Sequence, residues 1–175
     1  EKYQFTGWFF IPAGWVSASI EQQQIFQQND RCLLDSYPND RLILNKEELR
    51  SFQKKHVVGC HTMNHHRMSK EDTPEILVEE IRESKYLLEN ISGQTQTIFC
   101  WVGGEEQYYT KEAEELIRNS GYEFSFTTNT FPILKDANPF NLDRSNIETS
   151  YSSPLLLFQL SGLMDILYYP KRKRL

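Results

Sequence analysis

The stretch His56-Val-Val-Gly-Cys-His-Thr-Met-Asn-His-His66 decides the interpretation of this chain. Val57 to Cys60 is a short apolar run, which is typical of a buried strand. All four histidines of the chain lie in this stretch, and three of them follow the predicted strand. Ligands gather at the carboxyl ends of the strands in parallel α/β sheets. We therefore expect the segment His61–His66, called the histidine loop below, to lie where such a protein places a site.

Predicted strands and helices alternate on both sides of the histidine loop. The expected strands are Phe5–Pro12, Val57–Cys60, Thr97–Val102 and Tyr122–Thr128. The expected helices are Ser17–Gln28, Lys46–Lys55, Thr73–Ile91 and Thr110–Ser120. Leu34–Asp40 and Asn129–Asn146 carry the Pro, Asn and Asp residues of loops. This alternation favours an α/β domain with a parallel sheet, and the pattern leaves open whether the sheet is open or a closed barrel.

Helix-end signals support these boundaries. Asn45, Thr73 and Thr110 are residue types that cap the first turn of a helix. Gly93 and Gly121 suit the left-handed position that follows a helix.

The segment Leu155–Tyr169 is the longest apolar stretch of the chain. Polar residues interrupt it, so it is too short to span a bilayer, and we expect no integral membrane segment. A packed terminal helix is the first interpretation. The alternative is a helix on a membrane surface, backed by the basic run Lys171-Arg-Lys-Arg174, which otherwise is a solvated tail.

Composition narrows the class of protein. The 175 residues are 39% hydrophobic and 25% charged, as in one soluble globular domain, and we expect a single domain over residues 1–175. The net charge of −5 argues against a nucleic-acid partner. The three cysteines, Cys32, Cys60 and Cys100, are odd in number and widely spaced, so they do not form a disulfide framework. They weakly favour a reducing compartment. The first residues do not resemble a signal peptide, so localisation is unknown and weakly cytoplasmic.

The histidine loop contains a candidate metal pair. His61 and His65 are three residues apart, and on a helical turn this spacing would put both rings on one face. The hydroxyl of Thr62 is available to order the loop or a ring. The pattern alone equally fits ordinary surface or buried histidines. His56 is expected to end a helix favourably, and His66 to be an exposed neighbour.

These residues resemble a known family. His61-Thr-Met-Asn-His65 resembles the His-[Ser/Thr]-x-x-His motif of the polysaccharide deacetylases, the NodB-homology group of carbohydrate esterases. Other segments of this chain resemble segments of the family, and they occur in the same order as in the family. They are Phe5–Pro12, Ser84–Gly93 with Thr97–Phe99, Gly121–Asn129 and Asn138–Ile147. The resemblance implies an incomplete or distorted (β/α) barrel with parallel strands, similar to a TIM barrel.

The resemblance also implies a function, which is metal-dependent hydrolysis of the N-acetyl (carbon–nitrogen, non-peptide) bonds of a glycan in carbohydrate metabolism. In the family a divalent ion, usually zinc, is held by one Asp and two His. A carboxylate base activates water, and a late His protonates the leaving amine. If the roles of the family's residues are carried over to this chain, His61 and His65 are the metal ligands and Thr62 supports the loop. The implied partner is an N-acetylated glycan.

The chain departs from the family pattern at three places. The Asp-Asp pair of the first motif is expected before Phe5, ahead of residue 1, so we expect this domain to lack its first strand, its base and its third ligand. Phe99-Cys-Trp-Val-Gly-Gly104 stands where the family often has Arg-x-Pro. No histidine follows His66 that could be the late acid. The position in the sequence gives no reason to choose any internal acid as the missing metal ligand or base, among Asp35, Asp40, Glu105 and Glu106.

Two hypotheses follow from the resemblance and its gaps. The parent protein is a deacetylase, of which this chain alone has weak or no activity. Alternatively, the chain is a degenerate relative that binds a carbohydrate or a protein partner. Its sugar-stacking candidates are Trp8, Trp15, Trp101, Tyr108 and Tyr109. An absent first strand would leave a sheet edge exposed, which favours a homo-oligomer.

Overall fold

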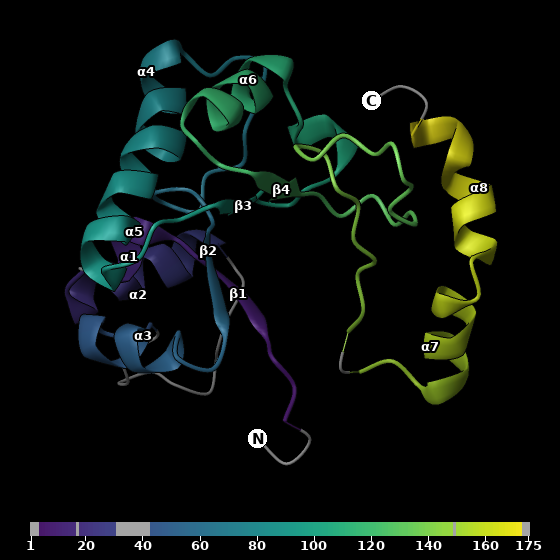
Figure 1. Cartoon of the computed structure of the whole chain (residues 1–175), viewed down its shortest axis with the longest axis horizontal. Coiled ribbons are helices and arrows are strands. Elements are labelled where there is room, and N and C mark those ends of the chain that lie inside the picture. The colour runs from purple at the N-terminus through teal and green to yellow at the C-terminus, as the bar shows by residue number, and fades with distance from the viewer. Residues whose placement is uncertain (1–3, 17, 31–42, 149, 173–175) are drawn as a thin grey trace.

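A parallel four-stranded sheet forms the centre of the molecule. The computed structural model describes residues 4–16, 18–30, 43–148 and 150–172. Its strands are β1 (Trp8–Ile11), β2 (Val57–Cys60), β3 (Ile98–Cys100) and β4 (Phe124–Phe126). They lie side by side in the order β1-β2-β3-β4 and all run parallel (Figure 1). The predicted parallel α/β fold is confirmed, and the sheet formed by the described residues is open rather than closed.

Helices lie between the strands and also follow the last strand, β4. They are α1 (Ala13–Val16), α2 (Ile20–Asp30), α3 (Lys46–Phe52), α4 (Pro74–Leu77), α5 (Ser84–Ser92), α6 (Lys111–Asn119), α7 (Ser153–Leu160) and α8 (Leu163–Arg172). A π-helical turn, η1 (Val78–Glu83), joins α4 to α5, and a 3₁₀ turn, η2 (Glu106–Tyr108), precedes α6. Figure 1 shows α1 to α6 gathered around the sheet, with α7 and α8 standing apart from it.

Most helix ends follow their sequence signals. The side chain of Asn45 accepts a hydrogen bond from the Glu48 N–H, and the Glu48 carboxylate accepts one from the Asn45 N–H. The hydroxyl of Thr110 caps α6 through the Ala113 N–H. Left-handed glycines end two helices, Gly93 at φ 75° and Gly121 at φ 83°. These ends are local, so local sequence predicts them well.

The helix expected from Ser17 begins later. The hydroxyl of Ser19 accepts a hydrogen bond from the Gln22 N–H, while the Gln22 side chain accepts one from the Ser19 N–H. This reciprocal pair makes Ser19 the capping residue, and α2 begins at Ile20. The prediction for Leu34–Asp40 lies outside the described residues.

The C-terminal segment differs most from expectation. Gly162, at φ 80°, breaks the apolar stretch into α7 and α8. The helices are not packed as predicted, because most of their large apolar side chains are exposed. Among the described residues, we find no helix with the length and apolar character needed to cross a membrane.

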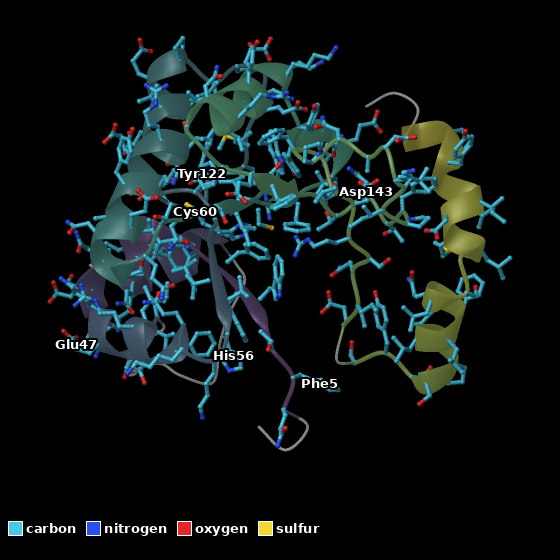
Figure 2. The ribbon with its side chains drawn as sticks, viewed as in Figure 1. Phe5, Glu47, His56, Cys60, Tyr122 and Asp143 are labelled. Atoms are coloured by element: carbon cyan, nitrogen blue, oxygen red, sulfur yellow. The ribbon has the colours of Figure 1, made fainter. Side chains whose placement is uncertain are left out.

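The core lies between the sheet and the helices that cover it. Its fully buried side chains include Leu49, Cys60, Ile81, Leu88, Phe99, Trp101, Ala113 and Ile117. Cys60, at the end of β2, lies in this layer near Tyr122, whereas His56 lies before the start of the strand (Figure 2). The sheet therefore presents its strand ends, with the histidine loop, at one edge of a packed layer.

The turn after β3 depends on Gly104. Gly104 has φ 71°, and a Cβ atom there would lie 2.9 Å from the Thr128 nitrogen. We predict that Gly104→Ala lowers the free energy of unfolding by about 2–4 kcal/mol, because left-handed strain and a backbone clash add. Urea unfolding measures this loss.

Gly93→Ala is the matched control. Gly93 has a similar φ of 75°, but its nearest neighbour to a Cβ atom is the Arg50 side chain at 3.9 Å. This control isolates the left-handed strain, about 1–2 kcal/mol. Equal losses in the two variants would contradict the close approach at Gly104.

Candidate metal centre

His61 is positioned by three neighbouring strands. It directly follows β2, and its backbone N–H donates to the Ile11 carbonyl at the end of β1 (3.0 Å). Its ring Nδ1 lies 2.7 Å from the Cys100 carbonyl oxygen at the end of β3. Because a carbonyl oxygen only accepts, Nδ1 carries the proton in this contact. The other ring nitrogen, Nε2, then has a lone pair for a ligand bond.

Burial favours the neutral form of His61. Removal from water lowers the pKa of His61 from 6.5 to about 4, and electrostatic interactions with His65 and Arg144 act in the same direction. The hydrogen bond to the Cys100 carbonyl opposes this shift. His61 is therefore neutral near pH 7, and neutral imidazole is the form that binds a metal ion.

His65 reaches His61 without a helical turn. Thr62 and His65 both have left-handed backbone angles, at φ 69° and φ 60°. The loop is therefore a tight irregular turn, and the predicted helical geometry is wrong. The two rings nevertheless meet, with centroids 4.9 Å apart and planes at 66°. Left-handed non-glycine residues are uncommon and persist where surrounding contacts hold them.

Thr62 orders the inside of the loop. Its side chain is fully buried, and its hydroxyl accepts a hydrogen bond from the His66 N–H at 3.1 Å. The Thr62 carbonyl accepts a hydrogen bond from the Ala13 N–H at 3.0 Å, which ties the loop to α1. The hydroxyl thus orders the backbone of the loop rather than a histidine ring.

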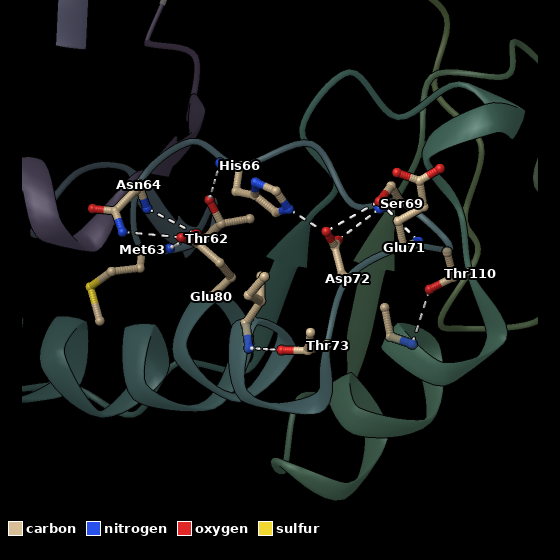
Figure 3. A network of polar contacts seen from close by, with 12 residues as sticks. Thr62, Met63, Asn64, His66, Ser69, Glu71, Asp72, Thr73, Glu80 and Thr110 are labelled. Carbon is tan, nitrogen blue, oxygen red and sulfur yellow. Dashed lines mark hydrogen bonds and ion pairs between the residues drawn. The ribbon is translucent and has the colours of Figure 1, made fainter.

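The other two histidines have partners elsewhere. The ring of His66 is partly buried, and its Nε2 lies 3.0 Å from a carboxylate oxygen of Asp72 (Figure 3). His56 does not end a helix, because α3 ends at Phe52. The Nδ1 atom of His56 instead accepts a hydrogen bond from the Gly7 N–H at 3.1 Å. This bond fastens the chain just before β1 to the start of β2.

Glu80 is a supporting residue that the sequence analysis missed. Its side chain is only 6% exposed, and one carboxylate oxygen accepts hydrogen bonds from the N–H groups of Met63 and Asn64, both at 3.0 Å. The other oxygen accepts one from the Asn64 side chain at 3.0 Å (Figure 3). Glu80 lies in η1, and a π-helical turn changes which side chains face the core.

Arg144 is a second residue that the sequence did not single out. Its guanidinium donates to the Thr127 carbonyl at 3.1 Å and to the Cys100 sulfur at 2.8 Å, and it lies over the ring of Phe10. The segment before it hydrogen-bonds beside β4, where the Leu142 N–H donates to the Ser125 carbonyl at 2.9 Å. A positive charge therefore lies next to His61, although the third motif has no arginine.

The donors present fit a divalent ion incompletely. Two imidazoles suit zinc, but a catalytic zinc site usually has three protein ligands. Within the described ranges, no three His, Cys, Asp or Glu side chains gather closely enough to hold an ion. Asp35 and Asp40 lie outside those ranges, and Glu105 and Glu106 lie at η2. The ligand roles of His61 and His65 stay a prediction.

Glu80→Gln tests how the loop is held. We predict a loss of about 1–3 kcal/mol in the free energy of unfolding, because Gln loses the negative charge and has one acceptor oxygen instead of two. Its amide nitrogen cannot accept the hydrogen bond from the Asn64 side chain. Urea unfolding measures the loss. Glu79→Gln is the control, since Glu79 is the exposed neighbour. Equal stability of the two variants would contradict the role of Glu80.

The low pKa of His61 predicts a pH dependence of stability. Between pH 6.5 and about 4, His61 is protonated in the unfolded chain but neutral in the folded protein. The free energy of unfolding should therefore fall by about 3 kcal/mol as the pH is lowered through this window. Urea unfolding with a chelator present should show a flatter profile for His61→Gln. Identical profiles for the two proteins would refute the buried neutral imidazole.

Several solved structures share this fold. A Streptococcus pyogenes deacetylase, PplD, has a TM-score of 0.67 at 16% identity, over 90% of this chain and 60% of its own. A de-N-acetylase from Aggregatibacter actinomycetemcomitans has a TM-score of 0.65 at 15% identity, over 90% of this chain and 66% of its own. IcaB from Ammonifex degensii has a TM-score of 0.60 at 18% identity, over 85% of this chain and 59% of its own.

Sequence comparison identifies the family. The chain has no significant match among curated protein sequences. It spans about 60% of the length of PplD, so it corresponds to a part of that protein. Residues 1–125 match the family described as polysaccharide deacetylase, which is well over half of the chain. This match, together with the shared fold, shows that the chain belongs to the polysaccharide deacetylase family.

Proposed function

We propose that this chain contributes the histidine part of the metal centre in a hydrolase that removes N-acetyl groups from a glycan. The observation that carries the proposal is the meeting of the His61 and His65 rings, 4.9 Å apart, at the end of β2. Family membership and the deacetylase names of the structural neighbours support it. Zinc is the ion that we expect, because two imidazoles are ligands that it favours.

Each residue of the loop has a distinct part in this proposal. His61 would hold the ion through Nε2, because its Nδ1 faces the Cys100 carbonyl. His65 would supply the second imidazole. Thr62 and Glu80 hold the backbone between them through buried hydrogen bonds. When bound, a zinc ion polarises an acyl carbonyl and makes water more acidic.

The proposal needs further groups from outside the described residues. In the described ranges, no third His, Cys, Asp or Glu side chain joins His61 and His65 in a group that could hold an ion. The activity and the glycan are therefore proposed for the whole protein.

Binding without catalysis is the second candidate function. Trp8, Phe10, Phe126 and Arg144 line a pocket of about 310 Å³ on the sheet. Trp8 is 52% exposed there, and aromatic faces of this kind stack on sugar rings. Trp15 and Trp101 are buried, so they are packing residues rather than stacking platforms. This pocket favours a carbohydrate over a protein as the bound partner.

Zinc binding tests the ligand assignment. We predict that the purified chain binds zinc and that His61→Ala and His65→Ala each weaken binding at least tenfold, because each removes one of two imidazoles. Isothermal titration calorimetry measures the affinity. His66→Ala is the matched control, since its ring faces Asp72. Unchanged zinc affinity in both His61→Ala and His65→Ala would contradict the assignment of these residues as ligands.

Acetate release separates the two candidate functions. With zinc and an N-acetylglucosamine oligosaccharide, we expect the 175-residue chain to release little or no acetate, since it supplies only two ligands. A longer protein with an upstream Asp-Asp motif should be active, and its His61→Ala variant inactive. Strong activity of this chain would rule out the non-catalytic alternative. Inactivity of the longer protein would instead favour carbohydrate binding.

A further inference from the structure

The two C-terminal helices expose an unusual amount of apolar surface. Seven of their Leu, Ile and Phe side chains are more than two-fifths exposed: Leu155, Leu157, Phe158, Leu160, Leu163, Ile166 and Leu167. The most exposed are Ile166 at 72% and Leu157 and Leu167 at 69% each. We call these seven residues the terminal apolar surface.

Nothing in the described fold covers this surface. Helices α7 and α8 pack against each other, and Figure 1 shows both standing apart from the sheet and from α1 to α6. Helix α7 is apolar nearly all round, with Gln159 its only polar residue after Ser153. A helix of that kind is normally buried, and large exposed apolar surfaces mark interaction sites.

The charges beside this surface indicate what covers it. From Ser150 to the last residue there is one acidic side chain, Asp165, and four basic ones, in Lys171-Arg-Lys-Arg174. The net charge of this segment is +3, whereas the whole chain carries −5. In the sequence, these basic residues closely follow the residues of the terminal apolar surface, on a chain that is otherwise acidic.

We propose that α7 and α8 bind the surface of an anionic lipid membrane. Leucine and isoleucine side chains of the terminal apolar surface enter the boundary between headgroups and acyl chains, and the basic run contacts anionic headgroups. Helices of 8 and 10 residues are about 12 and 15 Å long, which suits helices lying in the plane of the membrane. The left-handed Gly162 lets the two helices meet the surface as separate segments.

Charge distinguishes this partner from a second copy of the chain. A symmetric contact through α7 and α8 would pair two copies of a segment that carries a net charge of +3, and like charges repel. An anionic bilayer instead attracts the run, by about 1 kcal/mol for each basic residue near the surface.

Vesicle sedimentation tests the proposal. With the full chain, we expect binding to vesicles of phosphatidylcholine and phosphatidylserine, at least tenfold weaker binding to phosphatidylcholine alone, and a decrease with added salt. A triple variant, Leu157→Gln with Ile166→Gln and Leu167→Gln, should bind at least tenfold more weakly. The matched control is Ile133→Gln with Leu134→Gln, which removes comparably exposed apolar side chains elsewhere and should bind as the wild type does.

A second variant keeps the test clear if the apolar substitutions disturb folding. Replacing Lys171, Arg172, Lys173 and Arg174 by Gln leaves both helices apolar and should also weaken binding at least tenfold. Circular dichroism confirms folding of each variant. Failure of the wild type to bind anionic vesicles, or equal binding by the control and the triple variant, would overturn the proposal. So would a stable dimer in sedimentation equilibrium that the triple substitution dissolves and vesicles do not.

Discussion

The contact between His61 and the Cys100 carbonyl depends on the parallel alignment of β2 and β3. Because the two strands end at the same edge of the sheet, the last carbonyl of β3 lies beside the first side chain after β2. That carbonyl fixes which ring nitrogen of His61 carries a proton, and burial keeps the ring neutral. The sheet thus determines both the position and the protonation state of the first candidate ligand.

The histidine loop adds a second ligand only because buried groups stabilise its shape. Two residues of the loop occupy left-handed angles that side chains normally avoid. Glu80 from the π-helical turn and the hydroxyl of Thr62 satisfy loop N–H groups inside the fold. Without them the loop would be free to relax to ordinary angles, and the rings of His61 and His65 would separate. The site is therefore a property of the packed layer more than of the motif.

Local sequence signals predicted the strands, their parallel arrangement and the helix caps at Asn45 and Thr110. Contacts that are distant in sequence were not predictable. Glu80 acts across a π-helical turn that no residue pattern announces, and Arg144 reaches Cys100 from a segment expected to be only a loop. The helical turn between His61 and His65 was wrong, because the spacing of two histidines does not specify the backbone angles between them. The packed terminal helix was wrong because an apolar pattern predicts burial but does not name the partner.

The chain keeps the family fold at identities of only 15–18% to the three solved structures described above, and its third strand leads into Gly103-Gly104 rather than an arginine. We propose that His61 and His65 together hold a metal ion. X-ray absorption spectroscopy of the zinc-loaded chain tests it most directly. We expect two imidazole nitrogens at about 2.0 Å from zinc and the loss of that signature in His61→Ala. A first shell of sulfur at about 2.3 Å, or one without imidazole, would contradict it.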